Sequence, residues 1–151
     1  MLSIEISNRQ NILTIDIARL RRAVAAVMGD ARVTEGELSI AVVDDPTIHA
    51  LNRQYLEHDY PTDVLSFVLE RDGARLEGEV IVSSETAIRS AARWGWPPED
   101  ELLLYVVHGT LHLVGFEDTT DDARTEMRQQ ERRYLALLEV RAPEDPLTGE
   151  A

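Results

Sequence analysis

Two histidines and one aspartate within eleven residues have the spacing of a metal site. His108 and His112 are four residues apart in a segment that is apolar almost all round, so on a helix their imidazoles point to one place. Gly115 lets the chain leave that helix and turn back. Asp118 follows three residues later, where its carboxylate can return to the same point. We predict a His₂Asp set that holds one zinc ion per chain and leaves a fourth position for water or substrate.

Other interpretations of these residues stay open. Histidine pairs at this spacing also occur as ordinary core or surface residues, and other divalent transition metals accept the same ligands as zinc. Glu117, beside Asp118, is a candidate catalytic base, a carboxylate that orients a histidine, or a solvated acid in a turn. A zinc peptidase needs a glutamate directly after the first histidine, and Gly109 stands there instead. A peptidase is therefore our weakest functional hypothesis, and Gly109 indicates close approach of another backbone or room for a substrate.

The composition excludes several classes of protein. The chain has 151 residues and no cysteine, which removes disulfides, thiolate metal sites and cysteine nucleophiles together. Its formal charge of −13 has the wrong sign for holding nucleic acid by bulk electrostatics. All 15 cationic side chains are arginines, so anion binding must be local and forked. The sequence contains no apolar run of about 20 residues and no signal-peptide pattern, so we expect a cytoplasmic protein without membrane partners.

The hydrophobic periodicity predicts alternating strands and helices around the metal motif. Strands are expected over residues 2–6, 38–43, 63–69 and 79–82, with a hairpin loop over 71–78. We expect a first helix after a Thr14 cap up to Gly29, and a second from Asp45 with Ile48, Leu51 and Tyr55 facing inward. A third helix is expected over 85–94, capped by Ser83 or Ser84, and a fourth over 99–114. A fifth helix is expected after a Thr119 or Thr120 cap, with Met127, Tyr134 and Leu138 facing inward. This order predicts one α+β domain over residues 1–142, with a mixed sheet of about four strands and four to five helices. Residues 143–151 are expected to form a disordered tail.

The motifs together resemble one known family. The run HGTLHLVGFED at 108–118 and the run PTDVLSF at 61–67, with Leu51, Asn52, Tyr55 and Asp59, are similar to the YbeY family of bacterial endoribonucleases. The similarity extends from about Leu38 to Tyr134. It implies a zincin-like α+β domain with one zinc ion that cleaves single-stranded RNA. It further implies maturation of the 3′ end of small-subunit rRNA and ribosome quality control, with rRNA and small-subunit ribosomal proteins as partners.

Two positions depart from the family pattern. The family has a third histidine where this chain has Asp118, and an arginine where this chain has Leu56. Aspartate is an ordinary zinc ligand, but its charge makes the site less positive, so a bound water is less acidified. The loss of the arginine removes a phosphate clamp. These departures, with the acidic charge, motivate an alternative function: a ribosome-assembly binding factor with little or no nuclease activity, docked on a basic protein.

Several other side chains have a functional and a structural interpretation. Trp94 and Trp96 are candidates for base stacking, although anchoring in a core or loop is the commoner role of tryptophan. His58 is a candidate phosphate contact or a plain surface histidine. Asp63 is expected to cap a turn, and Ser66 to face the cleft. Arginines at 71, 75, 89 and 93 form a possible cationic strip, whereas Arg128, Arg132 and Arg133 are explained by ion pairs within a helix.

Overall fold

The structure, a computed structural model, describes residues 1–56 and 62–143 and contains one mixed sheet. Its strands are β1 (Leu2–Asn8), β2 (Glu35–Val43), β3 (Val64–Asp72) and β4 (Arg75–Ser83). They lie in the order β1-β2-β4-β3. β1, β2 and β4 run parallel, and β3 pairs with β4 in the antiparallel direction. The prediction of a mixed sheet of about four strands is confirmed, and the strongly apolar β2 lies inside the sheet as its composition requires.

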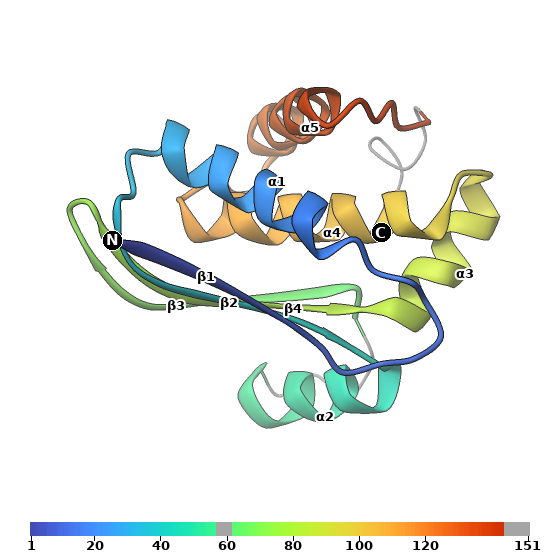
Figure 1. The fold of residues 1–151 in the computed structure, drawn as a ribbon. Coiled ribbons are helices and arrows are strands. Elements are labelled where there is room, and N and C mark those ends of the chain that lie inside the picture. The colour runs from blue at the N-terminus through green and yellow to red at the C-terminus, as the bar shows by residue number, and fades with distance from the viewer. Residues whose placement is uncertain (57–61, 144–151) are drawn as a thin grey trace.

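Five helices in the described residues complete the α+β fold that the sequence predicts. They are α1 (Ile17–Asp30), α2 (Asp45–Leu56), α3 (Ser84–Trp94), α4 (Pro98–Leu113) and α5 (Asp121–Leu137). Figure 1 shows α1 and α4 on one face of the sheet, α5 outside them and α2 on the opposite face. α3 lies at one end of the sheet and leads through a short turn into α4. The helix that carries both histidines is therefore enclosed by other elements.

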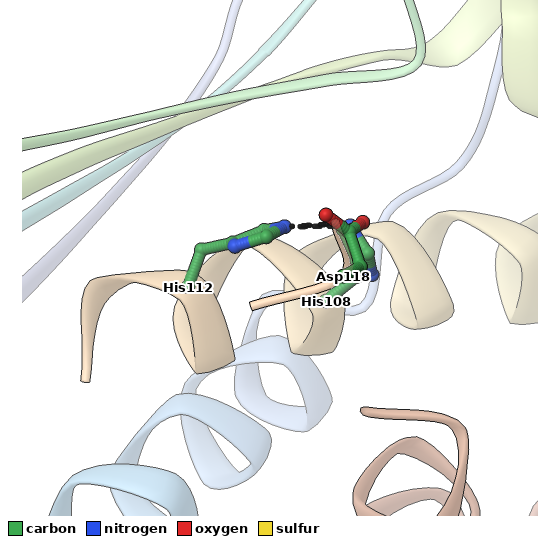
Figure 2. Close-up of side chains that lie close together, drawn as sticks. All are labelled: His108, His112 and Asp118. Atoms are coloured by element: carbon green, nitrogen blue, oxygen red, sulfur yellow. Dashed lines mark hydrogen bonds and ion pairs between the residues drawn. The ribbon is translucent and has the colours of Figure 1, made fainter. Parts of the chain in front are cut away.

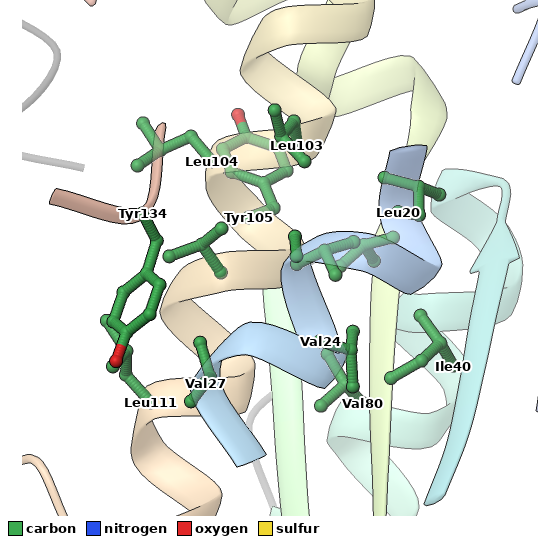
Figure 3. Close-up of a cluster of buried hydrophobic side chains, with 14 of the residues drawn as sticks. Leu20, Val24, Val27, Ile40, Val80, Leu103, Leu104, Tyr105, Leu111 and Tyr134 are labelled. Atoms are coloured by element: carbon green, nitrogen blue, oxygen red, sulfur yellow. The ribbon is translucent and has the colours of Figure 1, made fainter. Parts of the chain in front are cut away.

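The main core explains why α4 is apolar on nearly every side. Leu103 and Leu111 of α4 have 0% exposed surface, and Val24 of α1 and Ile40 of β2 are equally buried. Figure 3 shows these side chains in one cluster, with Tyr134 of α5 closing it from outside. Because sheet, α1 and α5 all pack on α4, no broad face of that helix is left for water. Full burial of a leucine stabilises a fold by about 1.5–3 kcal/mol, so α4 is held firmly in place.

For four helices, the structure either corrects the sequence prediction or chooses between two predicted capping residues. Asp16, not Thr14, caps α1, because its carboxylate accepts a hydrogen bond from the Arg19 backbone amide at 3.0 Å. Ser83 caps α3 and Thr120 caps α5, each through its side-chain oxygen. Tyr55 does not face inward as predicted. Its side chain is 59% exposed, and its ring lies edge to face with the Phe67 ring, with the ring centroids 5.9 Å apart.

The predicted loop over 71–78 is wrong, because β3 and β4 continue through most of it. β3 ends at Asp72 and β4 begins at Arg75, which leaves Gly73 and Ala74 as the loop. Gly73 has φ +58°, the backbone conformation that a tight hairpin requires at its first loop position. Charged residues that suggested a loop, including Arg75, instead lie on paired strands, where Arg75 forms ion pairs with Glu70 and Glu77. β4 also pairs with β2 here, and Leu76 is fully buried.

Parts of the sequence predictions fall outside the described residues. His58 and Asp59 lie in the undescribed segment 57–61, and the expected tail lies, after Pro143, in 144–151. Within the described helices, none combines the length and hydropathy needed to cross a bilayer.

Candidate metal centre

α4 places both histidines on the side of the helix that borders a cleft. His108 and His112 are one helical turn apart, and their rings stand edge to face with centroids 4.6 Å apart. Their side chains are 17% and 24% exposed, so both are sheltered and both reach solvent. Figure 2 shows the two rings converging on one point. The helical spacing thus has the effect predicted from the sequence.

A helix-terminating motif returns Asp118 to the same point. Gly115 has φ +105°, and its amide donates to the His112 carbonyl at 3.1 Å. The Phe116 amide donates to the Leu111 carbonyl, also at 3.1 Å. These paired bonds are the Schellman arrangement, in which a glycine ends the helix and reverses the chain. The reversal carries the Asp118 carboxylate to the histidine rings, as Figure 2 shows, so the role predicted for Gly115 is confirmed.

The three side chains have the spacing of a tetrahedral ligand set. The two Nε2 atoms are 3.1 Å apart, and Asp118 Oδ2 lies 3.4 Å from Nε2 of His108 and 3.5 Å from Nε2 of His112. Ligands bound tetrahedrally at 2.0–2.1 Å from a zinc-type ion lie about 3.3 Å from one another. The donor atoms therefore form one face of such a tetrahedron, with the fourth corner on the cleft side. This group could hold a metal ion.

The electrostatics of the group favour positive charge at His108. Burial disfavours the charged His108 ring, but the hydrogen bonds that the ring donates to Asp118 and Glu131 outweigh this effect and raise the pKa of His108 to about 9. The contact with His108 lowers the pKa of Asp118 to about 2, in spite of its partial burial. Carboxylates thus concentrate negative potential between the rings. A proton on His108 supplies the matching positive charge, and a bound metal cation would supply it in place of that proton.

Glu131 is a site residue that the sequence interpretation missed. Its side chain is 1% exposed, and its Oε2 lies 3.1 Å from Nδ1 of His108. A carboxylate only accepts hydrogen bonds, so Nδ1 of a neutral His108 carries the proton and Nε2 keeps its lone pair for a metal. Arg128 donates to Oε1 of Glu131 at 2.7 Å and balances its charge. Arg128 thus forms an ion pair within its helix, as predicted, and its partner Glu131 orients a histidine.

Gly109 lies at a tight contact between α4 and the sheet. A Cβ there would lie 2.6 Å from Cγ1 of Val80 and 2.9 Å from Cγ2 of Val64. Ser66 of β3 donates its hydroxyl to the Gly109 carbonyl at 3.0 Å. The glycine thus marks close approach, as predicted, but of strand side chains and not of a backbone or substrate. A peptidase glutamate has no room at this position.

The cleft beside the group has a volume of about 820 Å³ and contains several of the predicted candidates. Glu117, Asp63 and Ser66 line it, and so do Arg89, Arg93 and Trp94 of α3. Glu117 is exposed, and within the described residues Glu131 is the carboxylate that contacts a histidine Nδ1. The predicted cationic strip divides, since Arg71 and Arg75 lie on the β3–β4 hairpin away from this cleft.

Fold and site together define a class of protein: an α+β domain with a side-chain group that could hold a metal ion at the wall of an open cleft. The family described as "Endoribonuclease YbeY" matches residues 5–139. A relative of that name from Rhodopirellula baltica is 45% identical over 130 residues, which cover 85% of this chain and 66% of that protein. Another from Syntrophotalea carbinolica is 37% identical, covering 89% of this chain and 95% of the relative. The chain belongs to the endoribonuclease YbeY family.

A solved structure supports the fold alone. The solution structure of TM1509 from Thermotoga maritima is 24% identical in sequence and superposes with a TM-score of 0.63. The match covers 97% of this chain and 96% of the other. The α+β architecture with its mixed sheet is thereby common to both proteins.

Proposed function

We propose that this chain is a metal-dependent endoribonuclease that matures small-subunit rRNA, with one zinc ion held by His108, His112 and Asp118. The observation that carries the proposal is the spacing of the three donor atoms, 3.1 to 3.5 Å, at the wall of a cleft. Nitrogen and carboxylate ligands with tetrahedral spacing favour zinc, and nickel, cobalt or iron fit the same set. The family name supplies the reaction, since relatives over most of this chain are endoribonucleases by name.

Each residue around the site has a separate proposed role in catalysis. A bound ion would supply Lewis acidity toward a phosphate oxygen or lower the pKa of a water. Glu131 contacts Nδ1 of His108, which leaves Nε2 as the ring nitrogen that faces Asp118 and would bind the ion, and Arg128 holds Glu131 in place. Glu117, exposed at the cleft, is proposed as the general base that takes a proton from the attacking oxygen. The Schellman turn at Gly115 holds Asp118 opposite the rings.

The finer assignments of fold and partners belong to the same proposal. We propose the zincin-like label for this fold, because the helix with both histidines packs on one face of a mixed sheet. We also propose that residues 1–142 form one domain. The formal charge of −13 suits docking on basic small-subunit ribosomal proteins better than broad contact with RNA. An rRNA substrate would place this work in the cytoplasm.

Cleavage of an unstructured RNA oligonucleotide tests the proposal. The purified chain should cleave it with added zinc and stop when a chelator removes the ion. His112→Ala should abolish cleavage, while His49→Ala, a change on α2 at the opposite face of the sheet, should leave it intact. Cleavage that survives both the chelator and His112→Ala would contradict the proposal. A zinc-loaded chain that never cleaves RNA would favour the binding-factor alternative.

A further inference from the structure

The cleft of the metal group continues along α3, where its charges are uneven. Acidic side chains at Asp63, Glu101 and Glu117 line it, besides Asp118 and Glu131 of the metal group. An RNA strand entering such a cleft needs cations that its phosphates can reach. Which arginines of the lining are available therefore decides where the strand can lie.

Two of the three lining arginines are already paired with carboxylates. Arg89 donates to Oδ2 of Asp45 at 2.7 Å, and that same carboxylate accepts a hydrogen bond from Thr86. Arg128 is engaged with Glu131 at 2.7 Å. These guanidinium groups balance local acids and add little net positive potential to the cleft.

Arg93 is different. Among the residues that the structure describes, no carboxylate lies within ion-pair distance of it, and its side chain is exposed. Its guanidinium carbon lies 5.1 Å from the centroid of the Trp94 ring, the geometry of a cation–π contact. A cation–π contact does not use the guanidinium N–H donors, which can therefore bind an anion.

Trp94 and Trp96 flank Gly95 but have different environments. Trp96 donates its indole N–H to Oε1 of Glu101 at 2.8 Å and packs against the main core, so it anchors the turn between α3 and α4. Trp94 is half-buried and lines the cleft. A partly exposed indole beside an unpaired cation is the combination that single-stranded nucleic acid binding uses, because every base has a face to stack.

We propose that Arg93 and Trp94 form a nucleotide subsite at the α3 end of the cleft, which binds a nucleotide flanking the cleaved bond of a single-stranded RNA. Trp94 stacks on the base, and Arg93 pairs with a neighbouring phosphate. This subsite rests on the proposed function, since RNA is the ligand. It is separate from the metal group and sets how firmly the strand is held, with no part in breaking the bond.

The structural alternative makes a different prediction. Arg93 stands in the last turn of α3, where a cation also favours the helix dipole. If that were its whole role, Arg93→Ala would lower the melting temperature slightly and leave RNA binding unchanged. The two accounts are therefore separated by a binding measurement.

Fluorescence titration with a short unstructured RNA oligonucleotide tests the stacking on Trp94. The zinc-loaded chain is titrated at low temperature and over short times. Trp94 and Trp96 are the only tryptophans, so each can be observed alone. In Trp96→Phe, RNA should quench the remaining indole of Trp94. In Trp94→Phe, the remaining indole should show little change. Quenching of equal size in both variants would overturn the stacking assignment.

Salt-dependent affinity tests the cation. Arg93→Ala should weaken RNA binding about three- to tenfold at low salt and reduce the slope of log affinity against log salt by about 0.7. Trp94→Leu should weaken it about fivefold or more without changing that slope. The matched control is Arg22→Ala, an exposed helical arginine on α1 that does not line the cleft. An Arg93→Ala chain with unchanged affinity and slope overturns the subsite.

Cleavage kinetics keep the two proposals apart. Arg93→Ala should raise KM and leave kcat at saturating RNA close to that of the unmodified chain, because the subsite contributes binding alone. Cleavage that is normal in Arg93→Ala at all RNA concentrations contradicts the subsite but not the endoribonuclease. Absence of cleavage in the unmodified chain, with RNA binding still dependent on Arg93, contradicts the endoribonuclease but not the subsite.

Discussion

Replacing Glu131 by glutamine should weaken metal binding although the residue touches no metal. Its carboxylate accepts from His108 Nδ1 at 3.1 Å through Oε2 and from Arg128 at 2.7 Å through Oε1. An amide of the same shape has one acceptor oxygen, so one of these two donors would face an N–H group. Because the side chain is 1% exposed, water cannot readily supply the missing acceptor.

The size of the effect follows from these contacts. Loss of a partner that orients a metal-binding histidine costs about 10- to 100-fold in metal affinity, or about 1.4–2.8 kcal/mol. The buried unmatched donor should also lower the free energy of unfolding of the metal-free chain by about 1–3 kcal/mol. The zinc dissociation constant, measured by competition with a chromophoric chelator, reports the first effect. Thermal melting of the metal-free chain reports the second.

Glu126→Gln is the matched control, since Glu126 is an exposed acid on the same helix. It should bind zinc like the unmodified chain. A folded Glu131→Gln chain with unchanged zinc affinity would refute the claim that this carboxylate orients His108. Unchanged affinity with lost RNA cleavage would instead show that Glu131 acts directly in the reaction.

Two further predictions concern stability. Gly109→Ala should lower the free energy of unfolding by about 1–3 kcal/mol, because its methyl group would lie 2.6 Å from Cγ1 of Val80; Gly29→Ala, with no atom within 4 Å, should not destabilise the chain in the same melting experiment. In the metal-free chain, the raised pKa of His108 stabilises the fold at pH values below 6.5, and this stabilisation is lost as the pH rises toward about 9. The lowered pKa of Asp118 stabilises the fold at pH values above 3.8, and this stabilisation is lost as the pH falls toward about 2. Denaturant unfolding should therefore show a free energy of unfolding that declines between about pH 6.5 and 9, and an Asp118→Asn variant should show a smaller decline. A flat profile in the unmodified chain would contradict the stabilising contact between His108 and Asp118.

Local signals in the sequence were sufficient for most of the secondary structure. The apolar run of α4, the cap at Ser83 and the glycine at 115 each depend on neighbours within a few residues, and each has the predicted consequence. The predicted strands of the hairpin are too short because that prediction also used only local signals. Glycines and charges between 71 and 78 resemble a loop, but β4 pairs there with β3 on one side and with β2 on the other, and only the three-dimensional fold shows these partners.

The hydrophobic periodicity of the sequence could not predict features that depend on residues far apart in the chain. The order β1-β2-β4-β3 depends on crossovers over α1 and α2, which leave no mark on any single strand. Glu131 was missed because its contact with His108 spans 23 residues. One signal was present: Met127, Glu131 and Tyr134 share the inner stripe of α5, so an acid interrupts an otherwise apolar series. An ionisable residue at such a position points to a buried partner.

The amount of metal bound per chain tests the His108–His112–Asp118 assignment most directly. Plasma mass spectrometry on the untagged chain supplied with zinc should give about one zinc per chain, and Asp118→Ala should retain much less. Asp122→Ala, an exposed acid nearby in the sequence, should match the unmodified chain. Absence of metal in the unmodified chain, or full retention in Asp118→Ala, would contradict the assignment.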